Sequence, residues 1–229
     1  MKKISIKDVV EFRNKSAKSK QNFAIDVKLG KNKVKTEGGG NYWVSCISAV
    51  SNSYKLNNMQ PLLDKRDELV EKYEKTDYRK TKMMYKRNID ILYNCEKFDF
   101  DKWRPSKKIN IIRKFKDYSI LTIKGLQIQV NPNHIFTFEK NDVEEIGAIW
   151  FIAKLNGFRK EELGMFADVL YEYLNIHYSE KYTVNPKYCI TVDTFNSFDI
   201  NYLQLEKGEI PRILNSTIDE INELYNRSI

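Results

Sequence analysis

The stretch from Glu145 to Phe195 constrains the fold of this chain more than any other. It opens with an apolar run, IGAIWFIAKL, rich in β-branched and aromatic residues and followed by the turn pair Asn156-Gly157. From Glu161 to His177 apolar residues recur with the 3.6-residue period of an amphipathic helix. A second apolar run covers Tyr188 to Phe195. The stretch therefore predicts a strand, a helix and another strand.

The flanking segments add further strands and one more helix. Residues 118–130 contain two alternating runs about Lys124-Gly125, which is typical of a hairpin. His134 to Phe138 alternates like a strand, Asn201 to Leu205 is a weaker strand, and Ser216 to Tyr225 has the pattern of an amphipathic helix. We therefore expect an α+β protein in which the C-terminal part forms an antiparallel sheet packed with helices.

The N-terminal part begins with a capping signal. Ser5 lies three residues before Asp8, which predicts a short helix that ends near Asn14. A polar loop is expected over residues 15–20 and an alternating strand from Phe23 to Leu29. A helix with Asn41 as its N-cap is expected to follow.

The longest helical tract covers residues 59–97. A charged segment near Thr76 and Asp77 favours two helices, with one unbroken helix as the alternative. An irregular connection follows over residues 98–117. We place a boundary there between a basic, mostly helical region, 1–117, with a short N-terminal strand, and an acidic α+β region, 118–229, which could also form one continuous domain.

The net charge of +8 is divided unevenly along the chain. The first 117 residues have 29 Lys and Arg against 15 Asp and Glu, a net charge of +14, and the remainder has a net charge of −6. Such an asymmetry favours a polyanionic partner for the basic region. Alternatively, the acidic region could dock on its own basic region or on a second copy of the chain.

Several classes of protein are disfavoured. The longest apolar run, GAIWFIA, is too short for a membrane span, and the N-terminus lacks the apolar region of a signal peptide. Three cysteines that are odd in number and far apart indicate neither a disulfide framework nor a zinc site. Both histidines are expected to pack or cap. We expect buried free thiols, a cytoplasmic location, no membrane contact and no cofactor.

A glycine cluster supplies the first candidate site. Gly38 to Gly40 precede a predicted helix, and the helix N-terminus together with nearby lysines could hold a phosphate. A plain flexible loop explains the same residues. The residues of this candidate anion site are Lys33, Lys35, Gly38, Gly39, Gly40 and Asn41.

Acidic residues supply weaker candidates for catalysis. Asp26-Val27-Lys28 on the expected strand resembles the D/E-x-K element of metal-dependent nucleases, in which the carboxylate binds Mg²⁺ and the lysine positions water. A second acid at the start of a preceding strand is missing, and a solvent-facing strand explains the same pattern. Asp193, at the end of an expected strand, is another conceivable acid.

Basic and aromatic residues alternate through the long helical tract and just beyond it. Lys and Arg side chains contact phosphates, and exposed Tyr or Trp rings stack on bases of single strands. A charged helical face with its aromatic residues in the core is the other interpretation. The candidate nucleic-acid-binding residues are Arg79, Lys80, Lys82, Lys86, Arg87 and Arg104.

The leading hypothesis is a bacterial cytoplasmic accessory protein that binds DNA, RNA or a nucleoprotein partner and is not an enzyme. One alternative is a Mg²⁺-dependent nuclease or nucleotide-binding enzyme that uses Asp26, Lys28 and the glycine turn. Another alternative is a structural protein that forms a homo-oligomer.

Overall fold

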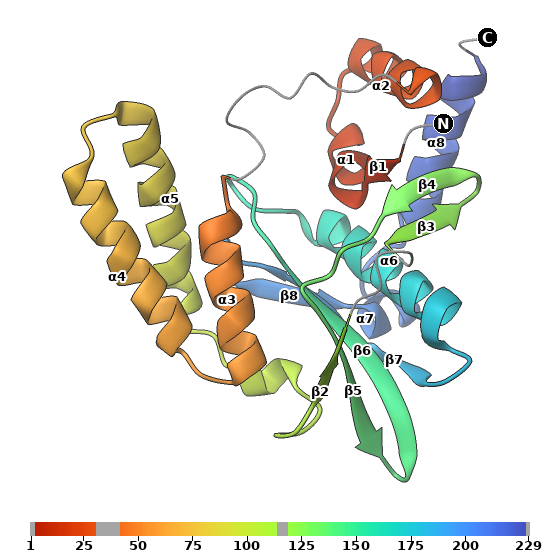
Figure 1. Ribbon diagram of the computed structural model, residues 1–229. Coiled ribbons are helices and arrows are strands. Elements are labelled where there is room, and N and C mark those ends of the chain that lie inside the picture. The colour runs from red at the N-terminus through yellow and green to blue at the C-terminus, as the bar shows by residue number, and fades with distance from the viewer. Residues whose placement is uncertain (1–2, 31–41, 114–118, 228–229) are drawn as a thin grey trace.

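A five-stranded sheet forms the middle layer of the protein (Figure 1). The computed structural model describes residues 3–30, 42–113 and 119–227. The strand order is β2-β5-β6-β7-β8. The strands are β2 (Asn110–Ile112), β5 (His134–Lys140), β6 (Val143–Ile152), β7 (Thr183–Asp193) and β8 (Phe198–Asn201).

The sheet is mixed, which corrects the expected antiparallel arrangement. β5 and β6 form an antiparallel hairpin, but β6 and β7 run parallel, with Ile149 opposite Ile190. Helix α6 (Lys160–Tyr178) carries the chain back across one face between these two strands, as parallel neighbours require. The α+β class is confirmed, and the strand, helix and strand of the central stretch are all present.

Helices cover one face of the sheet with a separate hydrophobic core. This layer contains α3 (Val44–Leu56), α4 (Gln60–Lys75), α5 (Arg79–Cys95) and the short 3₁₀ helix η1 (Phe100–Trp103). Phe136, Phe151 and Val192 point into it from three neighbouring strands. Residues next to these in sequence, such as Ile135 and Thr191, face α6 instead, because side chains alternate along a strand.

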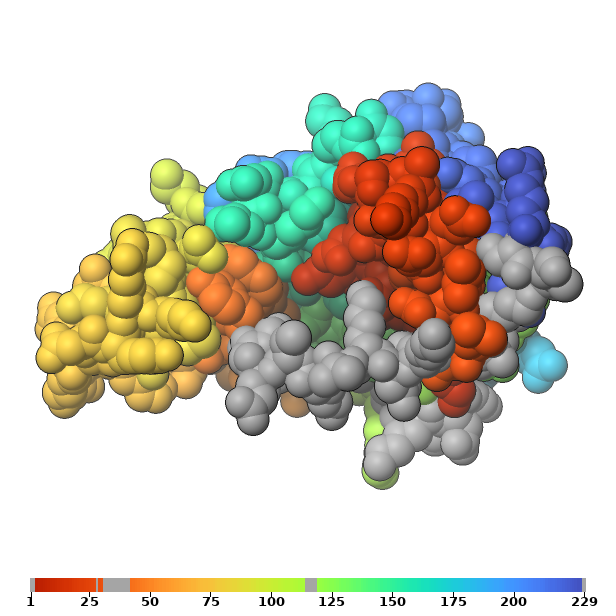
Figure 2. Space-filling view, turned by 90° about the horizontal axis from the view of Figure 1, so that it is seen from above, coloured from red at the N-terminus to blue at the C-terminus, as the bar shows by residue number. Residues whose placement is uncertain are grey.

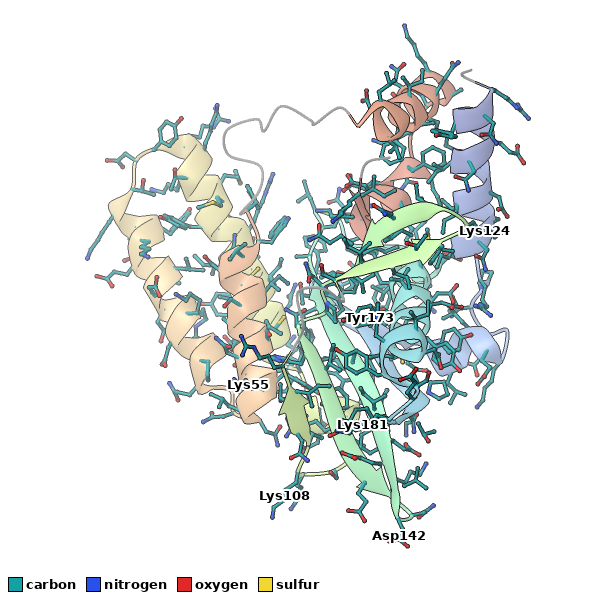
Figure 3. The ribbon with its side chains drawn as sticks, turned by 45° about the vertical axis from the view of Figure 1, so that its right-hand side comes forward. Lys55, Lys108, Lys124, Asp142, Tyr173 and Lys181 are labelled. Atoms are coloured by element: carbon teal, nitrogen blue, oxygen red, sulfur yellow. The ribbon has the colours of Figure 1, made fainter. Side chains whose placement is uncertain are left out.

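The other face holds a second, smaller sheet. Its strand order is β1-β4-β3, and the helices packed around it and beside α6 bury the other core. Lys124, in the β3–β4 turn, lies beside α8 and forms an ion pair of 2.6 Å with Asp219 (Figure 3). The remaining elements are β1 (Ile4–Ser5), α1 (Ile6–Phe12), α2 (Ala17–Leu29), β3 (Ile120–Ile123), β4 (Leu126–Gln129), α7 (Tyr202–Glu206) and α8 (Leu214–Asn226).

Strand pairing crosses residue 117 in both sheets. β1 pairs with β4, with Ile4 opposite Ile128, and β2 pairs with β5, with Ile111 opposite Phe136. Helices α2 and α8, from opposite ends of the chain, are also in contact. The division into regions 1–117 and 118–229 stays a prediction.

Several local expectations are confirmed. Ser5 and Asp8 form the predicted capping box, the long tract is two helices separated near Thr76, and the hairpin turn lies at Lys124 and Gly125. All three cysteines are free and buried.

Three local expectations are wrong. Residues 15–20 are not all loop, because α2 begins at Ala17, where the Ser16 hydroxyl accepts a hydrogen bond from the Ser19 N–H. The expected strand Phe23–Leu29 is the rest of that helix. The expected strand Asn201–Leu205 is mostly α7, which opens at Asn201 with a capping box that involves Gln204.

Candidate nucleic-acid interface

The starts of α3 and α5 lie at the same end of the helical layer, away from η1 (Figure 1). A hollow of about 800 Å³ lies between them. Figure 2 shows the α4–α5 hairpin as a lobe at one side of the molecule. The residues that line the hollow are Tyr42, Tyr78, Arg79, Lys80, Thr81, Met83, Met84 and Arg87.

This hollow collects three of the predicted nucleic-acid-binding residues. Arg79 and Lys80 occupy the exposed first turn of α5, and Arg87 lies two turns later. The Arg87 Nη1 donates a hydrogen bond of 3.1 Å to the Tyr42 hydroxyl, and its guanidinium lies 5.8 Å from the centre of the Tyr42 ring. Tyr78, which ends the preceding loop, is 64% exposed. Cations and an accessible aromatic ring therefore share one concave surface.

Ion pairing separates the cations of α4 from those at the start of α5. On α4 each lysine or arginine has a carboxylate partner: Lys65 and Lys72 pair with Glu68, Lys75 with Glu71, and Arg66 with Asp67 and Glu96. Within the described part of the chain, no carboxylate forms an ion pair with Arg79, Lys80 or Arg87. The first turn of α5 also has no acidic residue and no side-chain cap. Its positive helix end therefore adds to the local positive charge.

The other predicted cations contribute differently. Lys86 pairs with Asp90 at 3.3 Å, and the Lys82 ammonium lies 5.1 Å from the centre of the Tyr73 ring. Arg104 lies at the opposite end of α3, where its Nη1 donates a 2.7 Å hydrogen bond to the Tyr54 carbonyl. Tyr54 lies ten residues after Val44, the start of α3, which corresponds to about 15 Å along the helix. Arg104 therefore does not join the hollow at Tyr42.

A buried asparagine fixes the geometry of this surface, and the sequence analysis missed it. Asn88 is 2% exposed; its Nδ2 donates to the Tyr42 carbonyl at 2.8 Å and its Oδ1 accepts from the Cys46 N–H at 3.2 Å. Helix α3 begins at Val44, and its N-cap residue is Trp43, which makes no side-chain hydrogen bond to the helix; Asn41, the expected N-cap, lies outside the described residues. Asn88 therefore caps α3 from a neighbouring helix. The sequence contains one signal for this role, because Asn88 is a polar residue among the apolar residues of the buried face of α5.

The expected nuclease element does not assemble. Asp26 and Lys28 lie on α2, whereas the D/E-x-K element lies on a strand. The Asp26 side chain is exposed. Among the residues that the structure describes, no group of three or more His, Cys, Asp or Glu could hold a metal ion. The predicted anion site at Lys33, Lys35 and Gly38 to Asn41 lies outside the described residues.

Asp193 is a structural acceptor at the end of β7. Its Oδ2 accepts from the Phe158 N–H at 2.8 Å, and its Oδ1 accepts from the Phe195 N–H at 2.9 Å. The Asn196 side chain donates to Oδ2 as well, at 3.1 Å. Burial raises the pKa of Asp193, although these hydrogen bonds lower it. The carboxyl group joins two loops and is fully buried, so it does not face a ligand site.

A second hollow, called here the central cleft, lies where β6 ends, between α3 and α1. Its volume is about 670 Å³, and Tyr42 lines both this cleft and the basic hollow. Ser51 lines it too, 2.8 Å from the Nε2 of His134. The same Nε2 lies 2.9 Å from the Ser51 carbonyl oxygen, which can only accept. Nε2 therefore carries a proton and donates, so His134 is not a base for the Ser51 hydroxyl.

Comparison with known proteins adds no relative, since no protein-family model, curated protein or solved structure matches this chain. In the described ranges, no helix is both long and apolar enough to cross a membrane.

Proposed function

We propose that this protein binds single-stranded nucleic acid through the basic hollow at the start of α5. The observation that carries the proposal is the grouping of Arg79, Lys80 and Arg87, none paired with a described carboxylate, around an exposed Tyr78. Cations neutralise phosphates, and an exposed tyrosine gives a base a ring on which to stack. The uncapped N-terminus of α5 adds favourable charge for the same anion.

Charge alone does not explain this choice of surface. Helix α4 is as rich in cations, but its ion pairs already neutralise them. A phosphate that approached α4 would have to displace carboxylates, whereas at Arg79 and Lys80 it would meet donors that form no ion pair with any described carboxylate. The three cysteines are free and buried, which suits a reducing compartment, and we place the protein in the cytoplasm as an accessory component that does not itself catalyse a reaction.

The test measures affinity for a labelled single strand by fluorescence anisotropy at several salt concentrations. For single strands, the slope of log K against log salt changes by about 0.7 for each phosphate contact. The double variant Arg79→Ala/Lys80→Ala is expected to weaken binding and to reduce that slope by about 1.4. The variant Lys72→Ala/Lys75→Ala removes the same charge from α4 and serves as the matched control.

The control is expected to leave the salt slope nearly unchanged, because its lysines are already paired. Equal losses in both double variants would contradict a site at the start of α5 and indicate a general charge effect. Absence of binding by the unmodified protein at about 50 mM salt, where phosphate contacts are strong, would overturn the proposed function. Substitution of Tyr78 by Ala separately tests stacking, with an expected loss of about 1–3 kcal/mol.

A further inference from the structure

The central cleft has the size of a small-molecule site. Its volume of about 670 Å³ lies within the range of roughly 300–1,000 Å³ that is common for ligand pockets. Its lining residues come from the first turns of α3, the end of β6, the segment before β5 and the start of α1, and these elements can be located in Figure 1. The cleft therefore has room for a flat ring system and an entrance for it.

Aromatic side chains with fixed orientations form much of the wall. Trp150 packs edge-on against Phe166, with ring centres 5.5 Å apart, and Phe166 packs in the same way against Phe158. On the α3 side, Trp43 packs against Tyr42 at 4.7 Å. Both tryptophans are only partly buried, so each keeps surface available to a ligand. Rigid aromatic surface at low entropic cost is what binds planar rings.

The polar groups of the wall are almost all uncharged. The side chains of Gln129, Asn131 and Asn133 supply amides, and the Asn133 orientation is fixed because its Oδ1 accepts from the Phe151 N–H at 2.7 Å. Among the lining residues that the structure describes, Lys7 is the one charged residue, and its ammonium lies 3.9 Å from Glu11. Such a wall favours a neutral, flat group that carries both donors and acceptors. A nucleobase has this chemistry.

The cleft and the basic hollow meet at Tyr42. Tyr42 lines the basic hollow together with Arg79, Lys80 and Arg87, and it lines the cleft together with the aromatic and amide residues of the wall. A single strand whose phosphates lie in the basic hollow would thus have the cleft within reach of an adjacent base. We propose that the central cleft receives one base of a bound single strand. This inference rests on the proposed function, and it adds a contact that phosphates alone cannot make.

The experiment compares two single strands of equal length and equal phosphate number, one with all its bases and one with consecutive abasic sites. The unmodified protein is expected to bind the complete strand about tenfold more tightly, since one stacked base contributes roughly 1–3 kcal/mol. Ser48→Trp is expected to reduce that preference to the part that stacking on Tyr78 supplies, because Ser48 is an exposed residue of α3 that lines the cleft. Asn52→Trp is the matched control, one turn later on the same helix, exposed and outside the cleft.

A second variant protects the test against a folding defect. Asn131 is exposed, and Asn131→Leu removes an amide from the wall without removing a core side chain. It should also reduce the preference for the complete strand, with an unchanged midpoint of thermal unfolding. Quenching of a 2-aminopurine in the strand should be seen with the unmodified protein and with Asn52→Trp, but not with Ser48→Trp.

The outcomes separate the two proposals. The same preference for the complete strand in Ser48→Trp as in the unmodified protein, with binding still dependent on Arg79 and Lys80, overturns the base site and leaves the proposed function intact. Failure to bind either strand at low salt overturns both. Saturable binding of a free nucleoside, with no added affinity when it is part of a strand, overturns the base site in favour of a separate small-molecule site.

Discussion

Replacement of Asn88 by alanine tests the structural basis of the candidate interface. The side chain caps α3 through the Cys46 N–H and also holds the Tyr42 carbonyl. Cys46 is fully buried, so its N–H would find no water, at a cost of about 1–3 kcal/mol. The hydrogen bond from Asn88 to the Tyr42 carbonyl is only partly buried, and losing it adds about 1 kcal/mol to the cost of the substitution. The third hydrogen-bond partner of the amide, the Met84 carbonyl, accepts from Nδ2; Met84 lies inside α5, and its carbonyl keeps its helical hydrogen bond.

We therefore expect Asn88→Ala to lower the free energy of unfolding by about 2–4 kcal/mol. Urea denaturation followed by circular dichroism measures this as a shift of the midpoint at constant m-value. Asn94→Ala is the matched control: the same residue type on the same helix, but exposed, with one hydrogen bond of 3.1 Å to the Phe195 carbonyl. Its expected cost is below about 1 kcal/mol.

A cost for Asn88→Ala no larger than that for Asn94→Ala would refute the role of Asn88 as a buried cap. A second readout addresses the interface itself. Under conditions where Asn88→Ala is still folded, its affinity for a single strand should fall, because Tyr42 and with it Arg87 lose their fixed position. Unchanged affinity would mean that the hollow does not depend on this hydrogen bond.

Two further predictions concern the sheet and its loops. Gly147→Ala should lower the free energy of unfolding by about 2–4 kcal/mol in thermal unfolding, since a Cβ there would lie 2.7 Å from the Tyr188 carbonyl oxygen. The control Gly208→Ala has open space around the Cβ and a φ of 73°, so it should lower it by about 1 kcal/mol. Similar costs for the two substitutions would contradict the close approach at Gly147. Because burial raises the folded-state pKa of Asp193, its contribution to stability is full below the unfolded value of about 3.9 and falls as pH rises through the folded pKa. Asp193→Asn has no such titration, and it replaces one of the two oxygens that accept from the Phe158 and Phe195 N–H groups by an NH2 group. It should therefore destabilise the protein more at pH 4 than at pH 7, and a cost that grows with pH, measured by urea denaturation at several pH values, would contradict this sign.

The central stretch was predictable because its patterns span many residues. Short segments were not predictable, because a short pattern fits more than one kind of structure. Phe23 to Leu29 satisfies an alternating pattern and a helical one equally well over seven residues. Packing decides between strand and helix. The Phe23 and Phe12 ring centres lie 5.5 Å apart, and Val27 is buried in the same core, so the segment forms a helix. β2 has only three residues and lies at the sheet edge, so its sequence offered little signal.

The charged residues of the candidate site were predictable from the sequence, but the contacts between the helices that carry them were not. Arg79, Lys80 and Arg87 are near one another in sequence and on one helix, so a local pattern could group them. Tyr42 joins them only because α3 packs beside α5, a long-range contact that local patterns do not contain. Arg104 follows the same alternation of basic and aromatic residues in the sequence, but the fold places it at the far end of α3.

Directional polar contacts, more than apolar burial, set the shape of the central cleft. Helix α3 forms one wall, and its apolar contacts with the sheet would tolerate a small rotation about the helix axis. Three hydrogen-bonded positions prevent this rotation: Asn88 at Cys46, His134 at the Ser51 carbonyl, and the Ser53 hydroxyl at the Leu62 N–H. Cys46 lies in the first turn of α3 and Ser51 and Ser53 lie further along it, and the three positions connect α3 to α5, β5 and α4. The positions of Trp43 and Tyr42 in the two hollows are therefore a consequence of buried hydrogen bonds, which is why a substitution at Asn88 should affect stability and binding together.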